Sequence, residues 1–210
     1  MASVNIFETL RKRVEDSGGL LPQERRAMFW FRDYKSQLQQ WQSRTAGKSF
    51  GSLSKPFAKQ MVSSRDAAPG FLYFYMYDPI GRKTLDTYDR MPFTLVLDQD
   101  SKGFLGVNFH YLPYRTRAIF FDKLYADKLI KNRDPLKARI DATYEILNAV
   151  SKYKAFRPCL KRYLYAQVRT PLLQVGESEW DIALFLPVDK FAKMSRGQVW
   201  RNSARQMEGH

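Results

Sequence analysis

Between residues 71 and 113 the chain alternates short apolar and aromatic runs with turns made of proline, glycine and aspartate. Runs of this length are typical of strands, and the turn at Asp98–Gly103 separates two of them by the spacing of a hairpin. The dipeptide Asp78-Pro79 and the residue Pro113 end the first and third runs. Similar runs return near the end of the chain. Strands are therefore expected at residues 71–77, 92–97, 104–111, 172–175 and 180–186.

Helical patterns flank and interrupt these strands. Pro22 suits a helical first turn, and Ala27, Phe31 and Tyr34 follow it at helical spacing. Asp134-Pro135 has the residue types of an N-cap and a first helical position. Helices are expected at residues 3–15, 23–43, 114–130, 134–153, 158–166 and 189–194, with a flexible connection at 44–56 and a polar, basic end after residue 194.

The order of these elements predicts an α+β fold. We expect about five short antiparallel strands in one curved sheet or in a small SH3-like barrel, with inserted and flanking helices. Residues 1–66 are expected to form a helical N-terminal extension and linker. Residues 67–210 are expected to form the core domain, with a basic helical insertion at 114–166. Hydrophobic residues make up 44% of the chain, which is enough to build such a core.

Positive charge is concentrated in two segments of the chain, whose formal net charge is +14. Residues 1–66 hold 12 basic and 6 acidic side chains, and residues 113–172 hold 14 and 5, whereas the remaining segments are close to neutral. This excess favours an acidic partner, either nucleic acid or an anionic membrane, with a merely solvated charged surface as the alternative. The apolar runs are too short to span a bilayer, so we expect nucleic acid and no membrane.

The central basic segment supplies the candidate DNA contacts. Its cations can pair with phosphate, and interleaved aromatic side chains can stack on exposed bases, although each aromatic taken singly is more simply a core residue. Acidic residues within the segment are too few to neutralise its cations. No zinc-finger, basic-zipper or helix-turn-helix pattern indicates base readout, so contact with the DNA backbone or with an end is expected. The candidate DNA-binding residues are Arg115, Arg117, Lys123, Lys128, Lys131, Arg133, Lys137, Arg139, Lys152, Lys154, Arg157, Lys161, Arg162 and Arg169.

The sequence offers little for catalysis. Gly47-Lys48-Ser49 resembles the end of a phosphate-binding loop, but Gln42 stands where that loop needs its first glycine. With only His110, His210 and Cys159 as histidine or cysteine ligands, neither a zinc site nor a nucleophilic triad is expected. We expect no catalytic residue, no metal and no cofactor.

Aspartates leave one catalytic alternative. Two-metal nucleases use carboxylates, and several aspartates lie between residues 78 and 100. Those aspartates also lie at turns, where the residue belongs for reasons of geometry, so we favour the structural interpretation. The aspartates concerned are Asp78, Asp86, Asp89, Asp98 and Asp100.

Two features bear on location. The first residues lack the charged start and long apolar stretch of a signal peptide. Cys159 is the single cysteine, so no internal disulfide can form. The sequence therefore predicts a protein of the cytosol, or of a particle assembled there.

Several strings, taken together, resemble the DNA end protector (head completion) proteins of large contractile-tailed bacteriophages. They are Phe74–Pro79, Leu85–Pro92, Gly103–Pro113, Lys161–Tyr165 and Glu179–Pro187, and the resemblance covers about residues 70–202. It implies a non-enzymatic virion protein that binds the ends of the packaged linear genome. It further implies that the protein enters the host cytoplasm with the DNA, blocks the host exonuclease and helps to complete the head before tail attachment. The DNA contacts above are assigned by charge, and none is taken from the resemblance.

A structural role is the alternative. A neck, tail or baseplate protein without direct DNA-end binding would dock its basic surface on acidic phage head or neck proteins. Its anchors would be tryptophans, which are frequent energetic centres of interfaces, and the helix at 23–43 would serve as a docking arm. The tryptophans available are Trp30, Trp41, Trp180 and Trp200.

Overall fold

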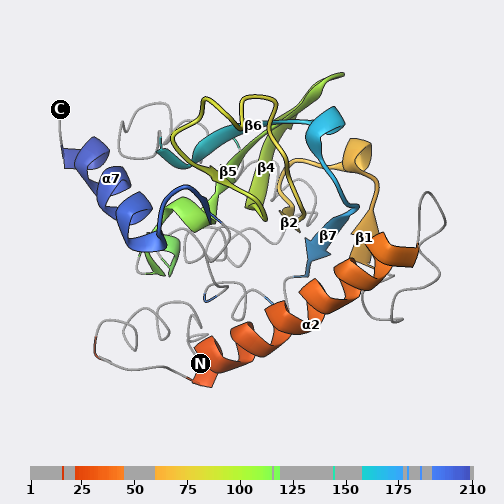
Figure 1. Ribbon diagram of the computed structural model, residues 1–210, viewed down its shortest axis with the longest axis horizontal. Coiled ribbons are helices and arrows are strands. Elements are labelled where there is room, and N and C mark those ends of the chain that lie inside the picture. Colours follow the sequence, from red (N-terminus) through yellow and green to blue (C-terminus); the bar gives the residue numbers. More distant parts are fainter. Residues whose placement is uncertain are drawn as a thin grey trace, which may run out of the picture.

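An antiparallel sheet of six strands forms the centre of the computed structural model (Figure 1). The structure describes residues 16, 22–44, 60–114, 116–118, 144, 158–176, 179, 185 and 191–208. The strands of this sheet are β1 (Met61–Val62), β2 (Leu72–Phe74), β4 (Phe93–Gln99), β5 (Gly103–Asn108), β6 (Leu160–Leu164) and β7 (Leu172–Val175), in the order β1-β7-β2-β4-β5-β6. The predicted α+β class is confirmed, but the sheet has six strands and does not close into a barrel.

Helices and a second small sheet complete the described part. The helices are α2 (Pro22–Arg44) and α7 (Arg196–Glu208), and β3 (Tyr88–Asp89) pairs with β8 (Phe191–Ala192). Short 3-10 turns are η2 (Ser64–Asp66), η3 (Phe109–Tyr111) and η5 (Tyr165–Gln167). Within the described residues, no helix combines the length and the apolar character needed to cross a membrane.

The predicted hairpin is confirmed by the pairing of β4 with β5, in which Thr94 lies opposite Asn108. Its turn is held by Asp100, whose Oδ1 accepts hydrogen bonds from the backbone N–H groups of Lys102 (2.8 Å) and Gly103 (2.9 Å). This is the turn geometry for which aspartate is suited. The strand expected at 104–111 ends earlier, at Asn108, because its last three residues turn into η3.

Alternation along the strands builds a core on each face of the sheet. Leu72 and Phe74 of β2 point to the larger core, together with Phe93 and Leu95 of β4. Tyr73, between them on the same strand, points to the smaller core on the other face, which it shares with Val96, Phe104 and Tyr163. This period-two pattern is what the alternating sequence dictates for a sheet covered on both sides.

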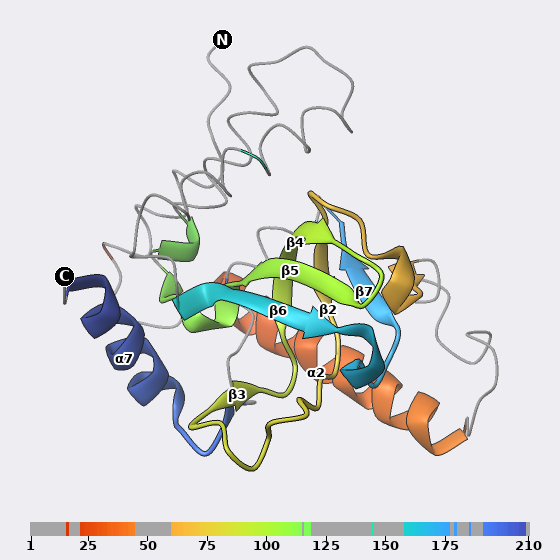
Figure 2. The same ribbon diagram turned by 90° about the horizontal axis from the view of Figure 1, so that it is seen from above.

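Helix α2 covers the larger core (Figures 1 and 2). Ala27, Phe31 and Tyr34 are buried there at helical spacing. The rings of Phe31 and Tyr34 lie 5.4 Å and 5.2 Å from that of Phe74, and the Tyr34 hydroxyl donates to the Phe74 carbonyl (3.2 Å). The predicted helix at 23–43 is therefore confirmed, but it packs on the sheet and does not project as a docking arm.

The N-terminal range also reaches the sheet itself. Met61 and Val62, which belong to the predicted extension and linker at 1–66, pair with Leu173 and Leu172 of β7. Of that range the structure describes residues 16, 22–44 and 60–66, and the helix and strand within it pack against the same core as the rest of the sheet.

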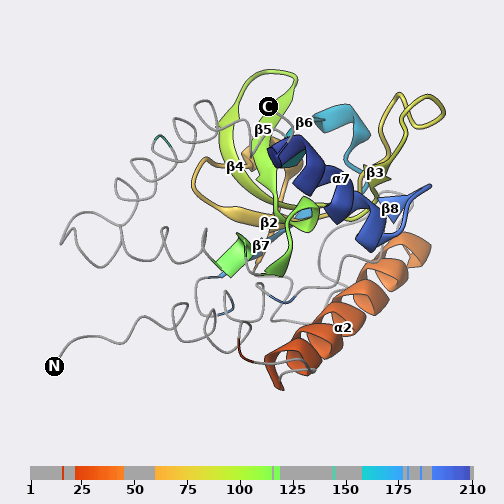
Figure 3. The ribbon, with the colours of Figure 1, turned by 90° about the vertical axis from the view of Figure 1, so that its left-hand side faces the viewer.

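Two helix predictions are wrong. Residues 160–164, within the expected helix at 158–166, form strand β6 and pair with β5 in the register Phe104 to Tyr163. Five residues span too few repeats of the hydrophobic pattern to distinguish a helix from a strand. The free edge of β5, with which these residues pair, makes them a strand. Residues 191–192, within the expected helix at 189–194, form β8, and a helix that was not predicted, α7, follows it (Figure 3).

Other predictions lie outside the described residues. They are the helix at 3–15, the connection at 45–56 with its Gly47-Lys48-Ser49 segment, the helix at 134–153 apart from Tyr144, and the strand at 180–186 apart from Phe185. Of the helix expected at 114–130, residues 114 and 116–118 are described and are helical.

Four buried tyrosines should make the fold sensitive to alkali. Burial raises the pKa of the Tyr34, Tyr75 and Tyr163 hydroxyls well above the ordinary value, and it raises the pKa of Tyr111 in the same way. In the unfolded chain the tyrosine hydroxyls ionise near pH 10, whereas in the folded chain these four hydroxyls keep their protons. The stability of the fold therefore falls as the pH rises from about 10 towards the pKa values of the tyrosines in the folded chain. Each tyrosine should cost about 1 kcal/mol between pH 10 and pH 11.

Tyrosinate absorbance followed together with circular dichroism checks this expectation. The four hydroxyls should ionise only as the fold is lost, and Tyr34→Phe should remove the contribution of one tyrosine to the pH dependence. The lowered pKa values of Arg117 and Lys161 work in the opposite direction by one proton each at most, and the raised pKa of Cys159 works in the same direction as the tyrosines. Ionisation of all tyrosines near pH 10 with an intact dichroism spectrum would contradict the burial seen here.

Candidate nucleic-acid interface

The described part of the chain contains four of the predicted DNA-binding residues. Arg117 lies in the short helical segment after Pro113, Lys161 and Arg162 lie on β6, and Arg169 follows η5. The others lie outside the described residues and stay predictions. They are Arg115, Lys123, Lys128, Lys131, Arg133, Lys137, Arg139, Lys152, Lys154 and Arg157.

Arg117 does not lie at the surface. Its side chain is fully buried, its Nε donates to the Leu112 carbonyl (2.9 Å), and its guanidinium lies 5.0 Å from the centre of the Tyr114 ring and 5.9 Å from that of Trp200. Burial lowers the pKa of this guanidinium to about 10. In this structure Arg117 therefore joins η3 to α7, and a polyanion outside cannot reach it.

Arg162 and Arg169 do lie at the surface, but each has an acidic neighbour. Arg162 pairs with Asp100 of the β4–β5 turn, and Arg169 lies 3.7 Å from Asp78, which also pairs with Arg82 at 3.1 Å. The central segment itself contains too few acidic residues to neutralise its cations, as expected. The acidic partners Asp100 and Asp78 come instead from the strand region that precedes this segment. Exposed pairs of this kind contribute little to stability, so phosphate can compete for the cations.

Lys161 is half-buried beside an aromatic ring. Its Nζ lies 4.4 Å from the centre of the Tyr111 ring, and burial lowers its pKa. Cys159, two residues earlier in the chain, is a buried free thiol, and burial raises its pKa to about 12. A thiol in that state is a poor nucleophile, so Cys159 acts as a core residue.

Asp89 is the centre of a buried polar network. Its Oδ2 accepts a hydrogen bond from Asn108 Nδ2 (3.0 Å) and lies 2.7 Å from His110 Nδ1, and its Oδ1 accepts one from the backbone N–H of Met91 (3.0 Å). Asn108 Nδ2 also donates to the Tyr163 hydroxyl (2.9 Å). The network thus ties β3 to β5, η3 and β6, and it gives Asp89 a structural role, while His110 Nε2 is buried without a hydrogen-bond partner among the described residues.

Three of the other four candidate aspartates serve turns or surface pairs, and the fourth, Asp86, is exposed. Asp98 accepts from the backbone N–H of Gln99, Asp100 holds the hairpin turn, and Asp78 pairs with Arg82. Across the described ranges, no three histidine, cysteine, aspartate or glutamate side chains come together as a metal-binding group. The arrangement gives the two-metal nuclease alternative no support.

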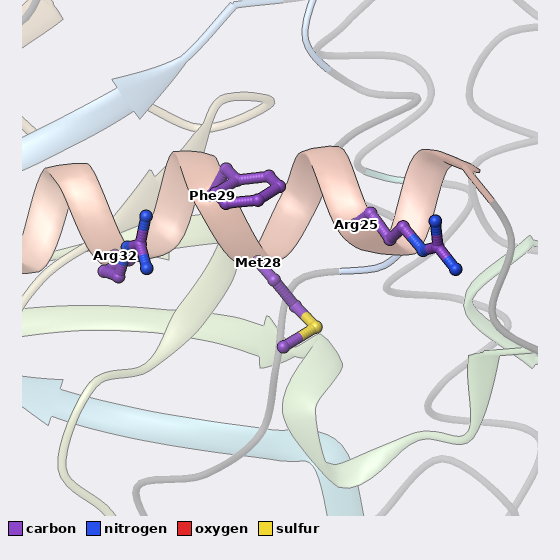
Figure 4. A pocket seen from close by; sticks show the side chains of 4 residues that line it. All are labelled: Arg25, Met28, Phe29 and Arg32. Atoms are coloured by element: carbon purple, nitrogen blue, oxygen red, sulfur yellow. The ribbon is translucent and has the colours of Figure 1, made fainter.

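The outer face of α2 carries cations and apolar side chains together, and we call it the α2 outer face. It consists of Arg25, Met28, Phe29 and Arg32, which line an open depression of about 250 Å³ (Figure 4). Phe29 is 61% exposed and Met28 is 54% exposed. Sequence reasoning missed this surface, although its signal was present, because Phe29 lies opposite the stripe of Ala27, Phe31 and Tyr34 that the core buries, and Met28 lies at the flank of that stripe.

The fold and these surfaces define a basic α+β protein with an open antiparallel sheet. Residues 3–207 match the family described as phage T4 terminal DNA protecting protein. The chain therefore belongs to the phage T4 terminal DNA protecting protein family, which confirms the resemblance seen in the sequence and extends it over nearly the whole chain. No match was found among curated proteins or among solved structures.

Proposed function

We propose that this protein binds the two ends of the linear phage genome, shields them from the host exonuclease and completes the head before tail attachment. The observation that carries the proposal is the family match over residues 3–207, since protection of DNA termini is the property for which the family is described. The net charge of +14 supports it, because a protein that holds DNA without base readout depends on cations facing phosphate.

To protect DNA in this way, the protein has to occupy the DNA end and does not have to cleave any bond. A protein seated on the terminal nucleotides excludes an exonuclease sterically, for as long as its residence exceeds the time the nuclease needs to engage. Charge alone gives affinity for any duplex, so the protein also needs a feature that distinguishes an end from the interior. In the cell, such a protein travels in the head or neck of the virion and reaches the host cytoplasm with the DNA.

A comparison of linear with circular DNA tests the proposal. The full chain should bind a linear duplex more tightly than a closed circle of the same sequence, and both affinities should fall steeply as salt rises. Pre-bound protein should also preserve the linear duplex against an exonuclease that attacks duplex ends. Equal affinity for the two forms would remove the end preference, and absence of binding at low salt would remove the DNA contact altogether.

The structural alternative loses two of its supports. Trp30 is partly buried against the larger core, and its Nε1 donates to Glu179 (3.2 Å). Trp200 packs on Tyr114, and its Nε1 donates to the His110 carbonyl (3.0 Å). These two side chains are used inside the fold and are not free anchors for a neighbouring subunit, while the side chains of Trp41 and Trp180 lie outside what the structure describes.

A further inference from the structure

Large apolar side chains face outward on the α2 outer face, and the fold does not require them there. The helix already packs against the core through another side, which carries Ala27, Phe31 and Tyr34. Phe29 and Met28 leave more than half of their surface in contact with water, which costs free energy without a structural return. Such a surface is a candidate for contact with a ligand.

Arginines bracket these two side chains. Arg25 and Arg32 lie on the same side of the helix as Phe29, four residues before it and three after it. The guanidinium carbon of Arg32 lies 5.1 Å from the centre of the Phe29 ring, and neither arginine forms an ion pair with a described residue. The depression of about 250 Å³ lined by these four residues is therefore both apolar and positively charged (Figure 4).

This combination fits the end of a duplex better than its interior. Along the interior, phosphates are accessible but base faces are covered by their neighbours in the stack. At a terminus, the last base pair exposes one flat apolar face with phosphates at its rim. An aromatic side chain stacks on such a face whatever its sequence, and arginine pairs with the phosphates.

We propose that the α2 outer face recognises the terminus itself: Phe29 and Met28 cover the exposed face of the last base pair while Arg25 and Arg32 hold the phosphates beside it. This inference rests on the proposed function and gives it the feature that distinguishes an end from the interior. Phe29 is the specificity-determining residue, and the two arginines add affinity that is shared by all duplex DNA.

Variants of Phe29 separate stacking from simple apolar contact. The measured quantity is the ratio of affinities for the linear duplex and for the closed circle. Phe29→Ala and Phe29→Leu should each reduce this ratio by about tenfold, since stacking of one base on an aromatic ring accounts for roughly that factor or more. Phe29→Trp should keep the ratio, because it keeps a flat ring. Ile80→Ala, which removes another exposed apolar side chain outside α2, is the matched control and should leave the ratio unchanged.

A fluorescent base reports the contact directly. With 2-aminopurine in the last base pair, the wild-type chain should change its fluorescence, whereas the same base in the interior should not respond. The response should vanish in Phe29→Ala. Arg32→Gln should weaken binding to the linear and circular forms alike and lower the salt slope by about one.

The outcomes distinguish the two proposals. If wild-type protein prefers ends and Phe29→Ala, with an unchanged circular dichroism spectrum, prefers them equally, the α2 outer face is not the recognition surface and the proposed function stands. That result would instead assign the surface to a protein partner. If the wild-type chain shows no end preference, the proposed function fails, and this inference fails with it.

Discussion

Replacing Asp89 with alanine should lower the free energy of unfolding by about 3 kcal/mol or more, since it strands several buried donors at once. The carboxylate is 4% exposed and accepts from Asn108 Nδ2 and the Met91 backbone N–H, with His110 Nδ1 at 2.7 Å. Water cannot replace these bonds without opening the contact between β3 and β5. Urea unfolding followed by circular dichroism measures the change.

Asp78→Ala is the matched control for this prediction. Asp78 lies at the surface and pairs with Arg82 and Arg169, so its loss should cost about 0–1 kcal/mol. The comparison also separates structure from chemistry. A catalytic Asp89 would leave a folded, inactive protein on substitution, and a stability within 1 kcal/mol of wild type would contradict the structural role argued here.

Gly103→Ala and Gly106→Ala should be the next most damaging changes, because β5 runs between two strands that leave no room for a Cβ. A Cβ at Gly103 would lie 2.0 Å from the Tyr163 carbonyl oxygen, and one at Gly106 would lie 2.3 Å from Thr94 Cγ2 and 2.6 Å from the Leu95 carbonyl oxygen. Backbone cannot move aside as a side chain can, so each variant should lose about 3 kcal/mol or more. Thermal unfolding gives the measurement.

Gly197→Ala supplies the opposite expectation with the same chemical change. A Cβ at Gly197 meets nothing closer than Arg201 Nη1 at 3.5 Å, which is ordinary contact with a flexible side chain. Because alanine favours a helix over glycine, this variant should gain stability by up to about 1 kcal/mol. A loss at all three positions would indicate that the damage arises from something other than the crowding at β5.

Prediction from sequence succeeded where a regular pattern was long or was bounded by clear turn residues. Helix α2 and strands β4, β5 and β7 follow from periodicity and turn residues that act locally. The prediction failed at β6, because its five residues follow a basic segment with a helical pattern and look like the end of that helix. Only their pairing with β5 makes them extended. The two-residue strands β1, β3 and β8 carry no pattern of their own, since their partners lie far away in the chain.

The candidate site shows the same division between local and distant causes. Charge along the sequence located the cations, but it could not show which residues surround them in the fold. Trp200, which helps to enclose Arg117, and Asp78, which lies beside Arg169, are each about 80 or more residues away in the chain. The α2 outer face is the reverse case. Its four residues form a local pattern that helical geometry alone could have revealed.

Strand β7 has a consequence for the way the chain is made. It sits between β1 and β2 in the sheet, although it follows them by about a hundred residues in the sequence. Until β7 has left the ribosome, β1 therefore has no strand partner in the sheet and β2 is unpaired along one edge. A gene truncated before Leu172 would encode a product that lacks an interior strand, so the N-terminal portion cannot serve as an independent half of the protein.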